Sequence, residues 1–269
     1  MSLNFDGRTA LITGASAGIG REIARVLARD VGALILVARR RERLDELAAE
    51  LTAARPGLRV SVRAVDLLDR SATGEMLDAL EREGEQVDIF VNNAGFGDHA
   101  LFVKSGWTKT EQMLELNVVS ATFLLHRLVP KMVARGFGAV LNVGSCAGIA
   151  PNPEMVAYSA TKAFVNLLSD GLRAELTGTG VSVTNLSPGP VPTEFQEVSG
   201  SHRLDTIPKA LHVEATQCAE EAVAGLKAGR ARVIPGAPLR AAMVSLESVP
   251  KALVRPVLAR LAERVKGRG

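Results

Sequence analysis

Residues 9–30 read TALITGASAGIGREIARVLARD. The first part, Thr9–Thr13, is a short apolar run of the kind that forms a buried β-strand. A glycine-rich turn follows, and then Ile19–Asp30, whose apolar residues recur at steps of three and four, which places them on one helical face. Those residues are Ile19, Ile23, Val26 and Leu27. The stretch therefore predicts a strand, a tight turn and a helix.

The same alternation continues along the chain. The other predicted strands are Ala33–Ala38, Val60–Val65, Ile89–Asn92, Ala139–Val143, Val181–Leu186 and Arg232–Ile234. The other predicted helices are Arg41–Ala54, Arg70–Glu83, Lys109–Arg135, Met155–Thr177 and Ala215–Ala228. Strands that are apolar on both faces and alternate with helices indicate a parallel sheet covered on both sides. We therefore expect an α/β fold: a single doubly wound domain with a seven-stranded parallel sheet and helices on both faces.

Composition excludes several classes of protein. The chain has 269 residues, of which 47% are hydrophobic and 23% charged, so it can bury enough surface to avoid disorder. Its two cysteines, Cys146 and Cys218, are too few for a disulfide framework or a four-thiolate zinc site, and we expect no metal. No apolar run is long enough to span a bilayer, and no signal peptide is evident. A cytoplasmic protein is expected.

Charge and proline content divide the chain. Residues 1–235 are expected to form the coenzyme-binding and catalytic domain, with a substrate loop at 188–214 that contains four prolines. Residues 236–269 are expected to form a basic helical extension, because residues 230–269 hold nine basic and two acidic side chains. The net charge of +3 therefore comes from the tail, and a nucleic-acid partner is not expected.

The turn after the first predicted strand is suited to a phosphate. Gly14, Gly18 and Gly20 permit a tight turn and let the backbone approach a pyrophosphate at the positive end of the helix. A glycine-rich turn by itself can be only a tight connection between strand and helix. Its position between the two is the one that a dinucleotide site requires, and we therefore expect nucleotide binding.

The end of the second predicted strand indicates which nucleotide binds. NAD-binding folds place an acidic side chain there, against the ribose hydroxyls, but this chain has Arg39, Arg40 and Arg41. A guanidinium can hold a 2′-phosphate through two parallel hydrogen bonds. NADP(H) is therefore favoured over NAD(H). The alternative is that Arg40, Arg41 and Arg43 only solvate the start of a helix, where cations are electrostatically unfavourable.

Tyr158 and Lys162 form a candidate acid–base pair. Tyr158 is the only tyrosine, and the four-residue spacing puts both side chains on one face of a helix. Lowering the pKa of a phenol from about 10 to about 7 needs roughly 4 kcal/mol. A positive charge about 4 Å away supplies about that much at an effective dielectric constant near 20. The alternative is an ordinary surface pair.

Together, these motifs resemble the short-chain dehydrogenases/reductases, and most closely their NADP-preferring, broad-specificity branch. The match extends from about residue 5 to about residue 235, which is nearly the whole of the expected Rossmann domain. The motifs that carry it are Gly14-xxx-Gly18-x-Gly20, Asn92-Asn93-Ala94-Gly95, Asn117, Ser145, Tyr158-xxx-Lys162 and Pro188-Gly189-xxx-Thr193. They occur in the family's order and at its spacing.

The resemblance implies a role for each motif. Tyr158 would exchange the substrate proton, Ser145 would hydrogen-bond the carbonyl oxygen, and Lys162 would hold the nicotinamide ribose, while Asn117 would position water in a proton relay. The implied coenzyme-binding residues are Gly14, Ser16, Ala17, Gly18, Ile19, Gly20, Arg39, Arg40, Asp66, Leu67, Asn93, Ala94, Gly95, Tyr158, Lys162, Pro188, Gly189, Val191 and Thr193. Without the resemblance, Ser145 and Asn117 can also be read as locally bonded polar residues.

Substrate choice is expected to depend on residues 96–104, 146–156 and 188–214. Their apolar side chains are Phe96, Leu101, Phe102, Cys146, Ile149, Met155, Val156, Val191, Phe195 and Leu204. A small apolar ketone or secondary alcohol is therefore the expected substrate. Asp98 and His99 are read as exposed loop residues, and Cys146 as packing rather than a nucleophile.

Three questions stay open from the sequence. The chain can instead be a 3-oxoacyl-thioester reductase that accepts acyl carrier protein, or a non-catalytic NADP-sensing protein. Family resemblance implies a homodimer or homotetramer, with the dimer formed through Lys109–Arg135 and Met155–Thr177. In the tail, apolar residues at 254–265 fall on one helical face. Packing on the chain's own domain is favoured for them over contact with an anionic membrane surface or with a neighbouring subunit.

Overall fold

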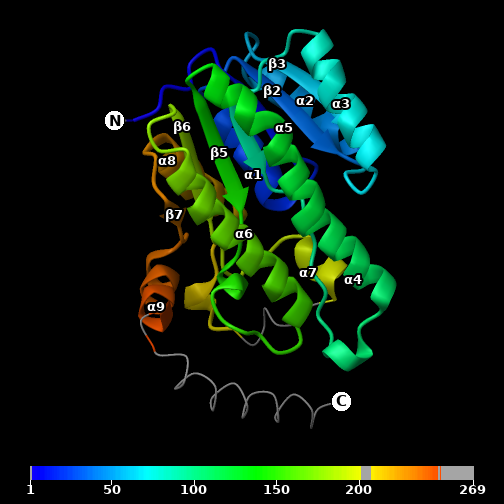
Figure 1. Cartoon of the computed structure of the whole chain (residues 1–269), viewed down its shortest axis with the longest axis vertical. Helices are drawn as coiled ribbons and strands as arrows, with labels where there is room; N and C mark the ends of the chain where they lie inside the picture. Colours follow the sequence, from blue (N-terminus) through cyan, green and yellow to red (C-terminus); the bar gives the residue numbers. More distant parts are fainter. Residues whose placement is uncertain (1, 201–206, 248, 250–269) are drawn as a thin grey trace.

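A seven-stranded parallel sheet forms the centre of the molecule (Figure 1). The computed structural model describes residues 2–200, 207–247 and 249. The strand order is β3-β2-β1-β4-β5-β6-β7. The strands are β1 (Thr9–Thr13), β2 (Ala33–Ala38), β3 (Arg59–Ala64), β4 (Ile89–Asn92), β5 (Gly138–Val143), β6 (Val181–Leu186) and β7 (Arg232–Val233). The predicted doubly wound fold is confirmed.

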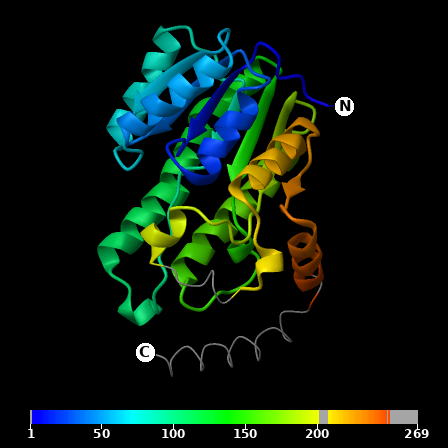
Figure 2. The same cartoon turned by 180° about the vertical axis from the view of Figure 1, so that it is seen from behind.

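Helices cover both faces of the sheet, and those at the five predicted segments other than Lys109–Arg135 begin and end within three residues of the predicted bounds. They are α1 (Gly18–Leu27), α2 (Arg41–Ala54), α3 (Arg70–Arg82), α4 (Trp107–Leu114), α5 (Ala121–Ala134), α6 (Val156–Glu175), α7 (Phe195–Ser199), α8 (Ala215–Lys227) and α9 (Ala237–Glu247). Figure 1 shows α5 and α6 in front of the sheet, and Figure 2, from behind, shows α1 and α8. The predicted irregular segment 188–214 contains the short helix α7 and one turn of 3₁₀-helix, Lys209–Leu211.

One predicted helix is interrupted. The segment Lys109–Arg135 was expected to be continuous, but a π-helical turn, Glu115–Ser120, separates α4 from α5. A π-turn holds one more residue than an α-turn, so it rotates the side chains that follow. Here the wider turn contains Asn117, whose amide is hydrogen-bonded to the backbone of Phe96. The hydrophobic period does not reveal such an insertion, because the apolar pattern resumes beyond it.

Alternate residues of each strand enter separate cores. In β1, Ala10 and Ile12 pack with buried residues of α1, α2 and α8, whereas Leu11 packs with those of α3 and α5 on the other face. Successive side chains of a strand point to opposite faces, so a sheet covered on both sides needs apolar residues at nearly every position. This requirement explains why the strands read as continuous apolar runs.

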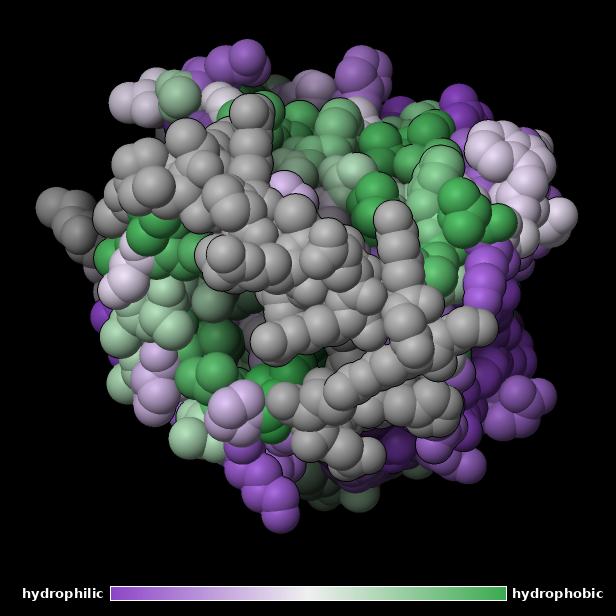
Figure 3. Space-filling model, turned by 90° about the horizontal axis from the view of Figure 1, so that it is seen from below, coloured by the Kyte–Doolittle hydropathy of each residue, from purple (hydrophilic) through white to green (hydrophobic). Residues whose placement is uncertain are grey.

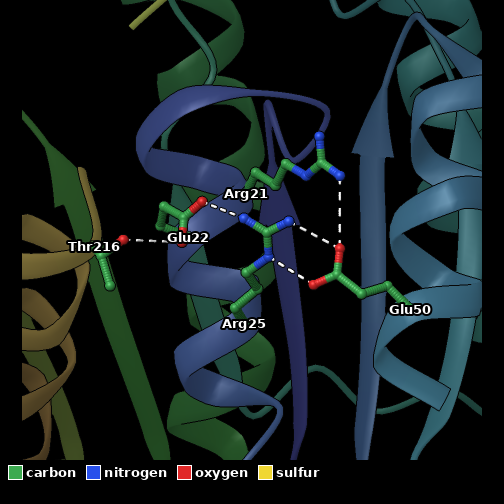
Figure 4. Close-up of polar contacts among 5 residues, drawn as sticks. All are labelled: Arg21, Glu22, Arg25, Glu50 and Thr216. Atoms are coloured by element: carbon green, nitrogen blue, oxygen red, sulfur yellow. Dashed lines mark hydrogen bonds and ion pairs between the residues drawn. The ribbon is translucent and has the colours of Figure 1, made fainter. Parts of the chain in front are cut away.

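Polar and charged side chains connect α1, α2 and α8, the helices on one face of the sheet (Figure 4). Arg25 on α1 pairs with Glu22 on the same helix and with Glu50 on α2, where Nε lies 2.7 Å from Oε1. Thr216 on α8 donates a hydrogen bond to Glu22. Contact with Arg25 keeps the pKa of Glu50 below its usual value, mainly through their hydrogen bond. The network fixes the positions of α1 and α2 relative to each other above their shared apolar core.

The carboxyl ends of the strands face one end of the molecule. The strand order reverses between β1 and β4, and ligands of open α/β sheets bind in the crevice outside such a point. α4, α7 and α9 lie at this same end (Figures 1 and 2). Viewed onto this end, the surface shows hydrophobic residues gathered in several places (Figure 3). A binding site is therefore expected at the carboxyl edge of the sheet.

The chain beyond β7 continues as α9, which packs against the domain. Leu239 is 4% exposed, and its side chain fills the space next to Gly189. Arg240 donates to the carbonyl of Ile234 at 3.2 Å, and Arg232 pairs with Glu247. The amphipathic segment at 254–265 and its predicted contacts lie outside the described residues. Among those described, no helix is both long and apolar enough to cross a membrane, and the cytoplasmic location stays a prediction.

Two glycines allow a matched test of the packing around the first turn. A Cβ at Gly20 would lie 2.5 Å from the carbonyl oxygen of Gly14, whereas Gly74, inside α3, has nothing within 4 Å of that position. We expect Gly20→Ala to lower the free energy of unfolding by about 1–3 kcal/mol through overpacking. We expect Gly74→Ala to raise it by about 0.5–1 kcal/mol. Urea denaturation followed by circular dichroism measures both, and an unaffected Gly20→Ala protein would contradict the packing described.

Candidate active site

The turn between β1 and α1 forms an open cradle of backbone. Gly14 and Gly18 have φ angles of +67° and +55°, which side chains rarely permit. A Cβ at Gly14 would lie 2.7 Å from Nδ2 of Asn93, so the close contact between the turn and the end of β4 leaves no room for a side chain there. The backbone N–H groups at the start of α1 and the bare backbone of the glycines suit a pyrophosphate.

The cradle is held by a residue that sequence reasoning did not select. Thr13, the last residue of β1, is completely buried, and its Oγ1 accepts hydrogen bonds from the backbone N–H groups of Asn93 and Ala94, both at 3.0 Å. Asn93 in turn donates its amide to the carbonyl of Thr13 at 2.8 Å. The sequence does contain a pattern that could have singled out Thr13: a threonine that ends an apolar strand and directly precedes a glycine.

A cavity of about 890 Å³ runs from this turn across the carboxyl edge of the sheet. It brings together nearly all of the predicted coenzyme-binding residues. Those that line it are Gly14, Ser16, Ala17, Gly18, Ile19, Arg39, Arg40, Asp66, Leu67, Asn93, Ala94, Gly95, Tyr158, Lys162, Pro188, Gly189, Val191 and Thr193. Ser145 lines it as well. The residues present therefore fit a dinucleotide.

Gly20 and Asn117 are the two predicted site residues that do not line the cavity. Gly20 lies behind the turn, packed against Gly14 and Asn93, so its role is close packing of α1 rather than contact with a ligand. Asn117 is 1% exposed and donates its amide to the Phe96 carbonyl at 2.9 Å and to Thr161 at 3.1 Å. Its Oδ1 accepts from Phe96 N. Both amide donors and the oxygen are used within the protein.

At one end of the cavity the two predicted arginines differ in their surroundings. Arg40 donates to Oγ of Ser16 at 3.1 Å and to Glu194 at 2.8 Å. Arg39 is 71% exposed, and its guanidinium lies 3.9 Å from the carboxylate of Asp66. Glu194 also accepts from Arg43. Sequence reasoning missed Glu194, since nothing near it in the chain indicates a partner 154 residues away.

Ser145 and Tyr158 are buried together at the other end. Ser145 is 8% exposed, and its Oγ accepts from the backbone N–H of Ala147 at 3.0 Å. Its own contact to the Pro188 carbonyl is long, at 3.5 Å. Burial raises the pKa of Tyr158 to about 12, and a hydrogen bond with Ser145 opposes that rise. The phenol is therefore protonated at neutral pH.

Lys162 carries its amine into the same region. The side chain is buried, and Nζ donates to the carbonyl of Val143 at 2.8 Å and lies 5.9 Å from the centre of the Tyr158 ring. Burial lowers the pKa of Lys162 to about 8. An ammonium has three donors, so those not bonded to Val143 can serve a ligand in the cavity.

Three buried asparagines hold the strand ends behind these groups. Asn166 donates to the backbone carbonyl of Ser145 at 3.2 Å, and Asn185 donates to Asn166 at 3.1 Å. Asn142, on β5, donates to Ser169 of α6 at 3.0 Å. Asn142 and Asn185 are polar residues in largely apolar strands. This pattern could have identified them as buried structural residues, but the sequence-based prediction did not include them.

The substrate end of the cavity differs from the prediction. Of the expected side chains, Phe96, Cys146, Met155, Val191 and Phe195 line it. Leu101, Phe102, Ile149 and Val156 do not line it, and Leu204 lies outside the described residues. Phe102 is 64% and Val156 50% exposed, because each lies on an outward face of a short helix or helix start. Side chains that were not predicted also line it: Ile207, Leu211, Leu239, Met243 and Leu246.

Two loop residues read as exposed are in fact covered. The side chains of Asp98 and His99 are 13% and 14% exposed. Asp98 pairs with Lys109 of α4 at 2.8 Å, and the backbone N–H of His99 donates to Ser199 at 2.9 Å. Contacts with α4 and with the end of α7 cover this loop, which its polar sequence does not indicate. The described residues hold no group of three side chains suited to a metal ion.

Comparison with known proteins identifies the family. A model of the short chain dehydrogenase family matches residues 8–203, most of the chain. The chain belongs to this family. It is therefore an oxidoreductase that acts on CH–OH and C=O groups with a nicotinamide coenzyme, and the predicted family and enzyme class are confirmed.

Three relatives illustrate the match. The NADP-dependent 3-hydroxy acid dehydrogenase YdfG of Escherichia coli strain K12 is 39% identical over 194 residues, 70% of this chain and 75% of that protein. A short-chain dehydrogenase from Sphingobium yanoikuyae in complex with NADPH has a TM-score of 0.81 at 33% identity, over 92% of this chain and 95% of that one. The bulky-bulky ketone specific alcohol dehydrogenase from Comamonas testosteroni has a TM-score of 0.74 at 30% identity, over 96% and 94%.

Burial of Lys162 predicts a pH-dependent cost to stability. The folded protein holds the Lys162 proton less tightly than the unfolded chain, because its pKa falls from 10.5 to about 8. Wild-type stability should therefore gain from this group as pH rises from about 8 towards 10.5. We expect Lys162→Met to be more stable than the wild type at pH 7.5, with the difference shrinking by pH 9.5.

Urea denaturation at the two pH values measures this difference. Lys209→Met is the matched control, since Lys209 is exposed and does not line the cavity. Its effect on the free energy of unfolding should be small at both pH values. A Lys162→Met protein that is less stable than the wild type at pH 7.5 would show that the ammonium stabilises the fold.

Proposed function

We propose that this chain is an NADP(H)-dependent reductase of apolar ketones, reversible with the corresponding secondary alcohols, within the broad-specificity branch of its family. The observation that carries the proposal is one cavity that joins a glycine cradle, an arginine beside Ser16, the Ser145–Tyr158–Lys162 group and an apolar wall. Each of these features also occurs singly in proteins of unrelated activity, but the proposed reaction uses all four, and here they lie in one continuous space.

The polar end of the cavity suits the 2′-phosphate of NADP(H). Arg40 and Ser16 are already hydrogen-bonded to each other at 3.1 Å, and the side chain of Arg39 extends into the same region. Guanidinium groups bind phosphate through paired N–H donors. The names of the Escherichia coli and Sphingobium relatives, which mention NADP and NADPH, support the same coenzyme for this chain.

Tyr158 is the group that we assign to proton transfer. NADPH supplies a hydride to the carbonyl carbon when it is bound. The neutral phenol, with its pKa raised to about 12 by burial, is in the form that donates a proton to the carbonyl oxygen. The contact of the Ser145 hydroxyl with the Pro188 carbonyl is long, at 3.5 Å, and the hydroxyl also bonds Tyr158, so a carbonyl oxygen placed between the two hydroxyls can accept from both.

Lys162 and Asn117 support this transfer in different ways. The free donors of Lys162 are placed to bind the ribose hydroxyls, and its charge favours the phenolate in the oxidation direction. Both amide hydrogens of Asn117 are donated within the protein, so its side chain has no N–H left for a water molecule, and its Oδ1 already accepts one hydrogen bond. A role of Asn117 in a water relay therefore has to use an oxygen, either Oδ1 or its backbone carbonyl.

The wall of the cavity favours an apolar substrate. The ring of Phe195 packs at a tilt against that of Tyr158, with ring centres 5.4 Å apart, and Leu239, Met243 and Leu246 of α9 add apolar surface. Lys109, a charged residue at this end, is neutralised by Asp98. The specificity of the Comamonas relative for bulky-bulky ketones is consistent with a large apolar group here.

Two other functions that the sequence permits find less support. A reductase of carrier-bound acyl chains requires a basic patch beside the cavity for an acidic carrier protein, and no feature of the described residues favours it over an apolar ketone reductase. A non-catalytic NADP sensor has no need of Ser145, Tyr158 and Lys162 in one buried group. The basic patch that a carrier-protein reductase requires could come from the extension beyond residue 249, which lies outside the described residues.

A homo-oligomer is part of the proposal. Phe164 and Leu167 lie three residues apart on α6 and are 40% and 75% exposed. Exposed aliphatic and aromatic side chains on one helical face are suited to contact with a second copy of the chain. They support the dimer that the family resemblance implies through α5 and α6.

Replacement of Tyr158 by phenylalanine separates an enzyme from a sensor. We expect Tyr158→Phe to lower kcat for ketone reduction by about 10²–10⁴-fold, the usual contribution of a general acid. The affinity for NADPH, measured by fluorescence titration, should change little. A protein that retains full turnover would contradict the role assigned to the phenol.

A charge on α9 tests the apolar wall. We expect Met243→Lys to lower kcat/KM for bulky aliphatic or aromatic ketones by about tenfold or more, because the pocket loses apolar contact and must desolvate an ammonium. Ala242→Lys is the matched control, since Ala242 is exposed on the same helix and does not line the cavity. Steady-state kinetics over a panel of ketones measures both. Equal losses in the two variants would remove α9 from the substrate site.

A further inference from the structure

Glu194 connects the substrate loop to the predicted 2′-phosphate site. It directly precedes α7, and its carboxylate accepts from Nη1 of Arg40 at 2.8 Å and from Arg43. Arg40 also donates to Ser16. Glu194 thus ties the loop after β6 to the start of α2, and Arg40 ties the start of α2 in turn to the glycine turn. Ser16, Arg40 and Glu194 all line the cavity.

The carboxylate of Glu194 is hydrogen-bonded to Arg40, the arginine that is predicted to bind the 2′-phosphate. Hydrogen bonds from Arg43 and Arg40 lower the pKa of Glu194, so it is ionised at neutral pH. A phosphate monoester carries a charge of about −1.5 to −2 at this pH and binds guanidinium through the same paired N–H groups. The 2′-phosphate must therefore displace Glu194 from Arg40 or lie beside a like charge.

We propose that Glu194 is a coenzyme-specificity residue, which competes with the 2′-phosphate of NADP(H) for Arg40. The inference rests on the proposed NADP(H) site. When the phosphate binds Arg40, Arg43 remains as the partner of Glu194 and keeps the loop attached to α2. The competition makes the preference for NADPH over NADH smaller than the arginines alone would produce.

The same competition links the two ends of the cavity. The neighbour of Glu194, Phe195, packs on the ring of Tyr158 with ring centres 5.4 Å apart. The backbone N–H of Phe195 also bonds Oγ1 of Thr193, a residue that lies against Gly18 of the glycine turn. A change of partner at Glu194 therefore acts on a short segment that contacts both the coenzyme cradle and the phenol.

Removal of the charge at Glu194 tests the competition by calorimetry with two simple probes. Adenosine 2′,5′-bisphosphate carries the 2′-phosphate, and ADP lacks it. We expect Glu194→Gln to bind the bisphosphate about two- to fivefold more tightly, the range of an exposed ion pair, with ADP affinity unchanged. NADPH and NADH should follow the same pattern in fluorescence titration. Glu197→Gln, an exposed residue of α7 with no ion pair among the described residues, should match the wild type.

A double variant locates the effect at Arg40. In an Arg40→Ala background, Glu194→Gln should no longer change the affinity for the bisphosphate, because the shared partner is gone. Unchanged or weaker bisphosphate binding in Glu194→Gln would overturn the inference, as would equal tightening of bisphosphate and ADP. A wild-type protein that binds the bisphosphate no better than ADP would overturn the proposed coenzyme itself, and the inference with it.

Discussion

The contact between the end of β1 and the end of β4 is the constraint on which the site depends. The hydroxyl of Thr13 accepts the backbone N–H groups of Asn93 and Ala94, and Asn93 returns its amide to Thr13. These bonds hold the two strand ends together where the sheet order reverses and its crevice opens. They also hold Asn93 against Gly14 and Gly20, which fixes the shape of the cradle. The cavity that the predicted site residues line extends from this point.

The chemistry of the site comes from burying groups that water would otherwise solvate. Tyr158 and Lys162 share a desolvated region, which raises the pKa of the phenol and lowers that of the ammonium. The buried ammonium has one backbone acceptor, the carbonyl of Val143, among the contacts described. Such an arrangement costs stability and is retained at sites where a perturbed pKa serves proton transfer. Asn166 offsets part of the cost, because it satisfies the backbone carbonyl of Ser145, and Asn185 holds Asn166 in place through a side-chain hydrogen bond.

The substrate end is assembled from segments that come late in the chain. The loop after β6 is tied to α2 through Glu194 and to the phenol through Phe195. α9 then covers it, with Leu239 against Gly189 and the aliphatic residues Met243 and Leu246 towards the cavity. The coenzyme end is made of backbone and charge, whereas the substrate end is made of apolar side chains. This division fits an enzyme whose coenzyme is fixed and whose substrate range depends on shape.

The sequence by itself determined the sheet, most of the helices that cover it and most of the predicted coenzyme residues that line the cavity. A strand buried on both faces must be apolar throughout, and a phosphate turn must leave its backbone open, so both leave local patterns such as Thr9–Thr13 and Gly14–Gly20. The Tyr158–Lys162 pair is local for the same reason, since one helix sets its spacing. Only the tertiary structure decided the π-turn at Asn117, the bridge from Glu194 to Arg40 and the wall provided by α9. These contacts join residues far apart in the chain, and packing between distant elements has no period that a sequence can display.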